Sequence, residues 1–113
     1  MNFFRNLFTP KFPSIDANTY KEQYFKKNNH VLIDVRTPGE FKGGHIPGAK
    51  NIPLDKLSQQ LNKVPKNRPV IVVCQSGNRS RSACNALINA GYENVTNFSG
   101  GTIRWRMGGN TVE

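Results

Sequence analysis

The residues best suited to covalent chemistry lie in one short stretch, Cys74-Gln-Ser-Gly-Asn-Arg-Ser80. An apolar run, Val70 to Val73, precedes the cysteine, and a helical pattern follows the loop. Gly77 permits a turn in which successive backbone amides point at one centre, and the amino end of the following helix points there too. The sequence therefore predicts that these amides, with the cation of Arg79, lower the pKa of Cys74 and make it a nucleophile at neutral pH.

The elements that must position this loop are predicted to alternate between strands and helices. Continuous apolar residues indicate buried strands at 30–36, 69–74 and 94–98. Helices are predicted at 17–27 with Asp16 as N-cap, at 55–61, at 80–90 before Gly91, and around Trp105. This order is typical of an α/β fold with three layers, in which helices cover both faces of a mainly parallel central sheet. Ligands of such folds bind at the carboxyl ends of the strands, and Cys74 is predicted to lie at one of these ends.

The length of 113 residues is that of one domain, since two domains would each be too small to bury a core. We expect an N-terminal arm at 1–13, the domain at 14–107 and a tail at 108–113. The arm carries an apolar stripe at helical spacing, which suits a small docking helix, a segment packed on the domain's own surface or a frayed terminus. The members of the stripe are Phe3, Phe4, Leu7 and Phe8.

Charge and hydropathy restrict the partners and the compartment. The chain carries 16 Lys and Arg against 7 Asp and Glu, and no acidic residue lies between Asp55 and Glu93, so an anionic partner is expected. No zinc-finger or other nucleic-acid-binding pattern is present, so no specific nucleic-acid partner is expected. No apolar run approaches the roughly 18 residues of a transmembrane segment, and no secretory signal is recognisable, so we expect a cytoplasmic location.

The two cysteines, Cys74 and Cys84, are expected to be free thiols. No CxxC pair or Cys/His cluster suggests a metal site. Cys84 falls among Ala83, Ala86 and Leu87 of the predicted helix, so we expect it to pack in the core. The alternative is a resolving thiol, which would have to lie within disulfide reach of Cys74.

Three stretches, taken in this order, resemble the rhodanese family of sulfurtransferases. They are Asp34-Val-Arg36 with Glu40-Phe41 and Gly44-His-Ile-Pro-Gly-Ala49, then the Cys74 loop, then Asn97-Phe-Ser-Gly-Gly101 leading to Trp105. Together they span most of the chain. The resemblance is to the small single-domain members, because no residues remain for a second domain of the kind that tandem members carry.

The resemblance implies that Cys74 takes the outer, sulfane sulfur of thiosulfate or a similar anionic donor and holds it as a persulfide. A thiol, cyanide or a protein would then accept the sulfur, and neither a metal nor an organic cofactor is implied. The remaining loop residues would bind the thiolate, the persulfide and the donor; they are Gln75, Ser76, Gly77, Asn78, Arg79 and Ser80. Many thiosulfate-using members carry a cationic residue in place of Gln75, so the choice of donor stays open.

Two further interpretations of the sequence compete with this one. Related cell-cycle phosphatases use a C-x5-R loop, whereas Cys74 and Arg79 form C-x4-R, which suits a sulfane sulfur better than a phosphoryl group. A rhodanese-like domain that only binds or regulates a partner is the alternative to an enzyme.

Asp34 and Arg36 are possible outer residues of the site, although Arg36 could equally pair with Glu40 to tie down a loop.

Overall fold

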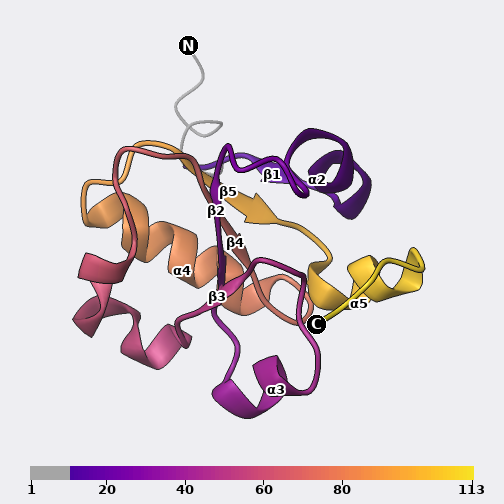
Figure 1. Ribbon diagram of the computed structural model, residues 1–113. Helices are drawn as coiled ribbons and strands as arrows, with labels where there is room; N and C mark the ends of the chain where they lie inside the picture. Colours follow the sequence, from indigo (N-terminus) through magenta and orange to yellow (C-terminus); the bar gives the residue numbers. More distant parts are fainter. Residues whose placement is uncertain (1–10) are drawn as a thin grey trace, which may run out of the picture.

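Five parallel strands form the centre of the computed structural model, which describes residues 11–113 (Figure 1). The apolar stripe of the N-terminal arm lies outside the described residues. The strands lie in the order β1-β5-β4-β2-β3, so the chain crosses over between neighbours as parallel pairing requires. Their bounds are β1 (Ser14–Ile15), β2 (Val31–Asp34), β3 (Lys50–Asn51), β4 (Val70–Val73) and β5 (Val95–Phe98).

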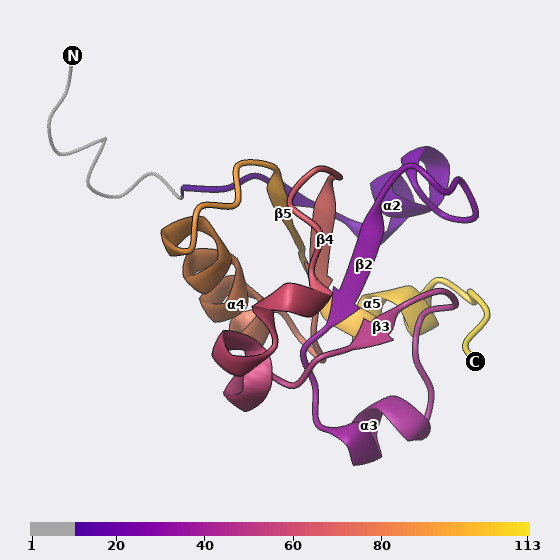
Figure 2. The same cartoon turned by 60° about the vertical axis from the view of Figure 1, so that its left-hand side comes forward.

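Helices cover both faces of this sheet (Figure 2). One face carries α2 (Ala17–Gln23) and α5 (Gly101–Met107), and the other carries α4 (Asn78–Asn89) with the 3-10 helices η1 (Leu54–Gln59) and η2 (Leu61–Lys63). The short helix α3 (Pro38–Lys42) lies beyond the carboxyl end of β2. The three-layer α/β fold predicted from the sequence is confirmed.

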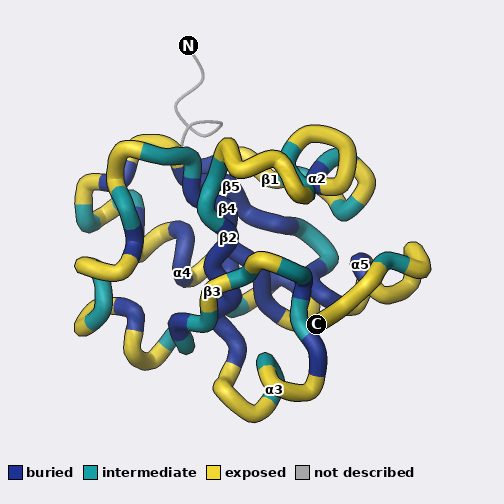
Figure 3. The backbone as a smooth tube through the Cα atoms, viewed as in Figure 1, coloured by how far each residue is buried: buried dark blue, intermediate teal, exposed yellow. Residues whose placement is uncertain are grey.

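The central strand β4 shows why its residues are apolar without interruption. Val70 and Val72 belong to the core on the α4 side, whereas Ile71 and Val73 belong to the core on the α2 and α5 side. None of these four side chains is more than 1% exposed, and β4 lies with β2 and β5 in the buried part of the backbone (Figure 3). Successive side chains of a strand point to opposite faces, so a strand covered twice needs apolar residues at every position.

The core beneath α2 and α5 is aromatic. The Trp105 ring lies 5.0 Å from the Phe25 ring and 6.0 Å from the Tyr20 ring, centroid to centroid, and Tyr20 lies 5.2 Å from Phe98. Trp105 also donates its indole N–H to the Thr111 carbonyl at 2.7 Å. Edge-to-face aromatic pairs add roughly 0.5–1.5 kcal/mol each to the burial of their area. Trp105 therefore packs α5 over the sheet, and the helix predicted around this residue is present.

Three predicted helices have different bounds in the structure. The helix predicted at 17–27 ends at Gln23, since Tyr24 already leaves helical geometry (φ −130°), and Lys26 then adopts a left-handed conformation (φ 62°). The segment predicted as a helix at 55–61 forms η1 and η2, whose amides bond three residues back. The helix predicted from residue 80 begins at Asn78, directly after Gly77, whose φ of 116° makes the turn.

The described residues contain no helix long and apolar enough to cross a membrane.

Candidate active site

The carboxyl ends of β2, β4 and β5 bring three loops together. Cys74 follows the last residue of β4, while β2 leads through Arg36 into α3 and β5 leads through Gly100 into α5. Parallel strands end at the same edge of a sheet, so residues far apart in the sequence meet there. The loop of Cys74 lies between the segments that carry α3 and α5.

The sulfur of Cys74 points inward from this loop. Its Sγ accepts a hydrogen bond from the Gly77 amide at 3.1 Å and donates to Ser80 Oγ at 3.4 Å. Cys74 is 1% exposed, and Ser80 and Gly77 are also buried. The loop residues Gln75, Ser76 and Asn78 are exposed, so the loop lies at the surface while its sulfur faces hydrogen-bond donors.

The balance of burial and hydrogen bonding sets the pKa of Cys74. Burial alone raises the pKa, but the Ser80 hydroxyl and the backbone amides of Ser80, Gly77 and Ser76 lower it, and the net direction is downward. Donors aimed at a sulfur stabilise its anion. The convergent amides expected from the sequence are therefore present around Cys74.

Helix α5 is attached directly to the loop, a feature that periodicity in the sequence does not reveal. The Thr102 amide donates to the Cys74 carbonyl at 2.9 Å, and the Ile103 amide donates to the Gln75 carbonyl at 3.2 Å. The Thr102 hydroxyl also donates to Gln75 Oε1 at 3.2 Å. The first turn of α5 thus fixes the backbone of Cys74 and Gln75, and the Gly100-Gly101 pair was its only signal in the sequence.

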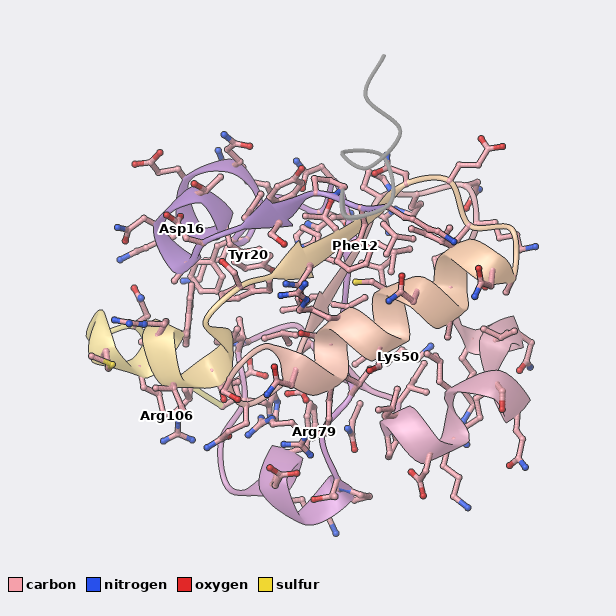
Figure 4. All side chains as sticks on the ribbon, turned by 180° about the vertical axis from the view of Figure 1, so that it is seen from behind. Phe12, Asp16, Tyr20, Lys50, Arg79 and Arg106 are labelled. Carbon is pink, nitrogen blue, oxygen red and sulfur yellow. The ribbon has the colours of Figure 1, made fainter. Side chains whose placement is uncertain are left out.

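Arg79 does not stand free in the loop. Its guanidinium forms two parallel hydrogen bonds to the Glu40 carboxylate, 2.6 Å from Nη1 to Oε1 and 2.9 Å from Nη2 to Oε2. Figure 4 shows Arg79 between α4 and α3. The side chain thereby ties the Cys74 loop to α3, and the carboxylate offsets part of its charge. This geometry makes Arg79 a support of the loop as well as a cation beside it.

Asp34 and Arg36 form a buried ion pair with each other. Arg36 Nη2 lies 2.8 Å from Asp34 Oδ2 and also donates to the Gly44 carbonyl at 2.9 Å, while the side chains are 3% and 0% exposed. The interpretation that Arg36 pairs with Glu40 is wrong, because Arg36 pairs with Asp34 and Glu40 pairs with Arg79. The Asp34–Arg36 pair holds the turn between β2 and β3 in place beside the site.

The Arg79–Glu40 pair should give the protein a measurable acid sensitivity. Hydrogen bonding from Arg79 lowers the pKa of Glu40 from 4.5 to about 2, so the pair stabilises the fold above pH 4.5 and this contribution is lost as the pH falls towards 2. Because both side chains are about one-third exposed, we expect only about 0.5–1 kcal/mol.

Urea unfolding of the wild type and Glu40→Gln across this pH range measures the effect. Glutamine retains an oxygen for the capping bonds to the Thr37 amide and hydroxyl, so the substitution isolates the charge. The difference in unfolding free energy between the two proteins should be largest near neutral pH and should shrink as acid is added. A difference that does not change with pH would contradict the assignment.

Cys84 lies in the core on the α4 side and is 0% exposed. Burial, with a further contribution from Cys74, raises the pKa of Cys84 to about 12, and both cysteines are free thiols. Its packing among the buried residues of α4 agrees with the expectation from the sequence. The described residues contain no group of three or more His, Cys, Asp or Glu side chains that could hold a metal ion.

The two thiols should differ strongly in reactivity. With iodoacetamide near neutral pH, we expect the native protein to take up one label, on Cys74, on the order of 1000-fold faster than a second label on Cys84. Peptide mapping of the labelled protein measures this, and denatured protein serves as the control in which both thiols react. Equal labelling of the two thiols in the native protein would contradict the pKa difference.

Comparisons with known proteins agree with this architecture. The family model described as "Rhodanese-like domain" matches residues 16–107. A protein from Allochromatium vinosum named "Sulfurtransferase" is 36% identical over 95 residues, which cover 84% of this chain and 89% of that protein. The thiosulfate sulfurtransferase GlpE of Tolumonas auensis is 39% identical over 75 residues, covering 66% of this chain and 71% of the relative.

Solved structures agree as well. A rhodanese-related protein from Thermoplasma volcanium superposes with a TM-score of 0.81 at 29% identity and covers 90% of this chain and 98% of its own. A rhodanese-like domain protein from Staphylococcus aureus gives a TM-score of 0.77 at 33% identity, covering 83% of this chain and 91% of its own. This chain, with Cys74 at the carboxyl end of its central strand, belongs to the rhodanese-like family.

Proposed function

We propose that this protein is a sulfurtransferase that carries a sulfane sulfur on Cys74 as a persulfide. The observation that carries the proposal is the arrangement of the Gly77 amide at 3.1 Å and the Ser80 hydroxyl at 3.4 Å around a sulfur whose pKa is lowered. Similarity to proteins named sulfurtransferases supports it. The Gly77 amide donates to the sulfur and the Ser80 hydroxyl accepts from it, and a cysteine that only packed the core would have no need of these hydrogen-bond partners.

The chemistry takes two displacements. The Cys74 thiolate attacks the outer sulfur of thiosulfate, the S–S bond of the donor breaks, and sulfite leaves with the electron pair. An acceptor thiolate or cyanide then attacks the outer sulfur of the persulfide, and Cys74 leaves as the thiolate. The sulfur held by the loop is anionic at both stages, first as the thiolate and then as the persulfide, so the same backbone amides stabilise it in both.

The charge around the loop suits an anionic donor. Lys42 of α3, Arg81 of α4 and Arg104 of α5 are exposed, and none of them forms an ion pair with a carboxylate of the described residues. Arg81 and Arg104 lie in the first turns of α4 and α5, which begin at the sheet edge that holds Cys74, whereas Lys42 is the last residue of α3, which lies beyond that edge. A surplus of positive charge at this edge attracts small anions such as thiosulfate and raises their rate of encounter.

Intact-mass measurement after incubation with thiosulfate, and separately with glutathione persulfide, tests the proposal. We expect a gain of one sulfur atom, about 32 Da, which cyanide then removes as thiocyanate. Trypsin separates the two cysteines, since Arg79 and Arg81 lie between them, so the sulfur can be located on the Cys74 peptide after alkylation.

The outcomes of this measurement are distinct. A gain of sulfur from glutathione persulfide alone would support the sulfurtransferase proposal and exclude thiosulfate as the donor. No gain with either donor would overturn the proposal and favour the alternative, a rhodanese-like module that binds a partner without catalysis.

A further inference from the structure

A chain of hydrogen bonds runs from the sulfur of Cys74 into the core and out again to β1. Cys74 Sγ contacts Ser80 Oγ at 3.4 Å, and Ser80 Oγ lies 2.7 Å from Oδ1 of Asn97. At its other end, the Asn97 side-chain amide donates from Nδ2 to Ser14 Oγ at 3.2 Å. Asn97 is 2% exposed and lies in β5, next to β4 in the sheet. No charged group takes part in this chain.

The Ser80 hydroxyl has one hydrogen and three possible acceptors. They are Asn97 Oδ1 at 2.7 Å, the Gly77 carbonyl at 3.0 Å and the Cys74 sulfur at 3.4 Å. While Ser80 donates to Asn97, it can only accept from Cys74, and this suits a thiol that carries its own hydrogen. In this state every hydrogen bond in the chain points from the sulfur towards Ser14.

When Cys74 loses its hydrogen, its sulfur can no longer donate to Ser80 and needs a hydrogen-bond donor instead. A thiolate, and equally the inner sulfur of a persulfide, has no hydrogen to give and is best served by a donor. If Ser80 turns its hydrogen to the sulfur, Asn97 Oδ1 loses its partner inside the core, which carries the penalty of a buried unpaired acceptor. A half-turn of the amide avoids this, because Nδ2 then donates to Ser80 while Oδ1 accepts from the Ser14 hydroxyl.

We propose that Asn97 is a positioning residue for the chemistry of Cys74, whose side-chain amide turns over when the sulfur loses its hydrogen and so frees the Ser80 hydroxyl to donate to the sulfur. The proposal rests on the proposed function in one respect, that Cys74 works as an anion. The two ends of a carboxamide are nearly the same size, so the turn needs no extra space in the core. All four groups remain paired before and after it.

Other charged groups near Cys74 are paired with each other and do not compete for this hydrogen. Arg79 of α4 is held by Glu40 of α3, and Asp34 of β2 is held by Arg36. Cys84 of α4 is the remaining titratable neighbour, and burial keeps it protonated because its pKa is about 12. Among the described residues that contact the Cys74 sulfur or its hydroxyl partner, the Asn97 amide is the group able to change from acceptor to donor.

Nuclear magnetic resonance of the wild type follows the amide directly. Below the pKa of Cys74, the Asn97 side-chain N–H protons should show their strongest contacts to the β protons of Ser14, and above it to those of Ser80. In the Cys74→Ser variant, whose hydroxyl does not ionise in this range, the contacts should stay at Ser14. Contacts that stay at Ser14 in the wild type at both pH values would overturn the proposal.

The substitution Asn97→Asp tests the same proposal through the pKa of Cys74. A carboxylate at position 97 only accepts, so it should keep the Ser80 hydrogen and raise the pKa of Cys74 by about one unit, slowing alkylation below that pKa about tenfold. The negative charge alone would also raise the pKa. Ser80→Ala separates the two effects, because in that background the rise from Asn97→Asp should shrink by half or more. Equal rises with and without the hydroxyl would overturn the proposal.

These measurements distinguish this inference from the proposed function. If the amide turns over with the ionisation of Cys74 but no donor adds a sulfur, the positioning role stands and the sulfurtransferase proposal fails. If Cys74 gains and releases sulfur while the Asn97 amide stays fixed, the sulfurtransferase proposal stands and the positioning role of Asn97 fails.

Discussion

Cys74→Ser is expected to take up no sulfur from any donor and to release no thiocyanate to cyanide. The hydroxyl of serine ionises far above neutral pH and forms no analogue of a persulfide, so the loss should be at least on the order of 1000-fold, to the limit of detection. The fold should survive, because a hydroxyl can accept from the Gly77 amide and donate to Ser80 as the thiol does. Intact mass and thiocyanate release measure the loss, and circular dichroism verifies the fold.

Cys84→Ala is the matched control for this experiment. It removes the other thiol of the chain from the buried side of α4 and should leave sulfur uptake within about twofold of the wild type, at a cost of about 1 kcal/mol for the small cavity. Uptake that survived in Cys74→Ser and vanished in Cys84→Ala would transfer the chemistry to Cys84 and refute the assignment.

Gly101→Ala is expected to have the largest effect on the fold of the site. Gly101 has a φ of 62°, and a Cβ at this position would lie 2.3 Å from the Gln75 carbonyl oxygen and 2.5 Å from that of Cys74. These are backbone atoms, so either α5 or the Cys74 loop must move, and the bonds from Thr102 and Ile103 that join them must stretch. We expect a loss of about 3–5 kcal/mol in unfolding free energy, and sulfur uptake at least about tenfold slower.

Gly48→Ala separates the clash from the cost of the backbone conformation. Gly48 also has a positive φ, 87°, but a Cβ there would meet nothing within 4 Å. Its substitution should cost only about 1–2 kcal/mol, the ordinary penalty for an alanine in the left-handed region, and should leave sulfur uptake unchanged. Urea unfolding and sulfur uptake of both variants provide the comparison. Equal losses of unfolding free energy in the two variants would show that the close packing of Gly101 against the Cys74 loop contributes nothing to stability.

Elements with a strong local pattern could be predicted from the sequence. The central strand needs apolar residues at every position because both of its faces are covered, and that run is visible without any structure. By contrast, β1 and β3 have two residues each and α3 has five, too short for periodicity to register. These short elements form because neighbouring strands and caps hold them, as the Thr37–Glu40 capping box does for α3.

The sequence by itself determined the fold class and the loop in which a cysteine is followed by converging amides, since both depend on residues close together in the chain. Only the tertiary structure decided the partners of the loop. Arg79 pairs with Glu40 across 39 positions, and Ser80 bonds to Asn97 across 17. The local spacing of Arg36 and Glu40 suggested a different pair, because sequence distance does not reveal which side chains the parallel strands deliver to the same edge. The physical reason is that the order of the strands in the sheet, set by the packing of the whole core, determines which loops become neighbours.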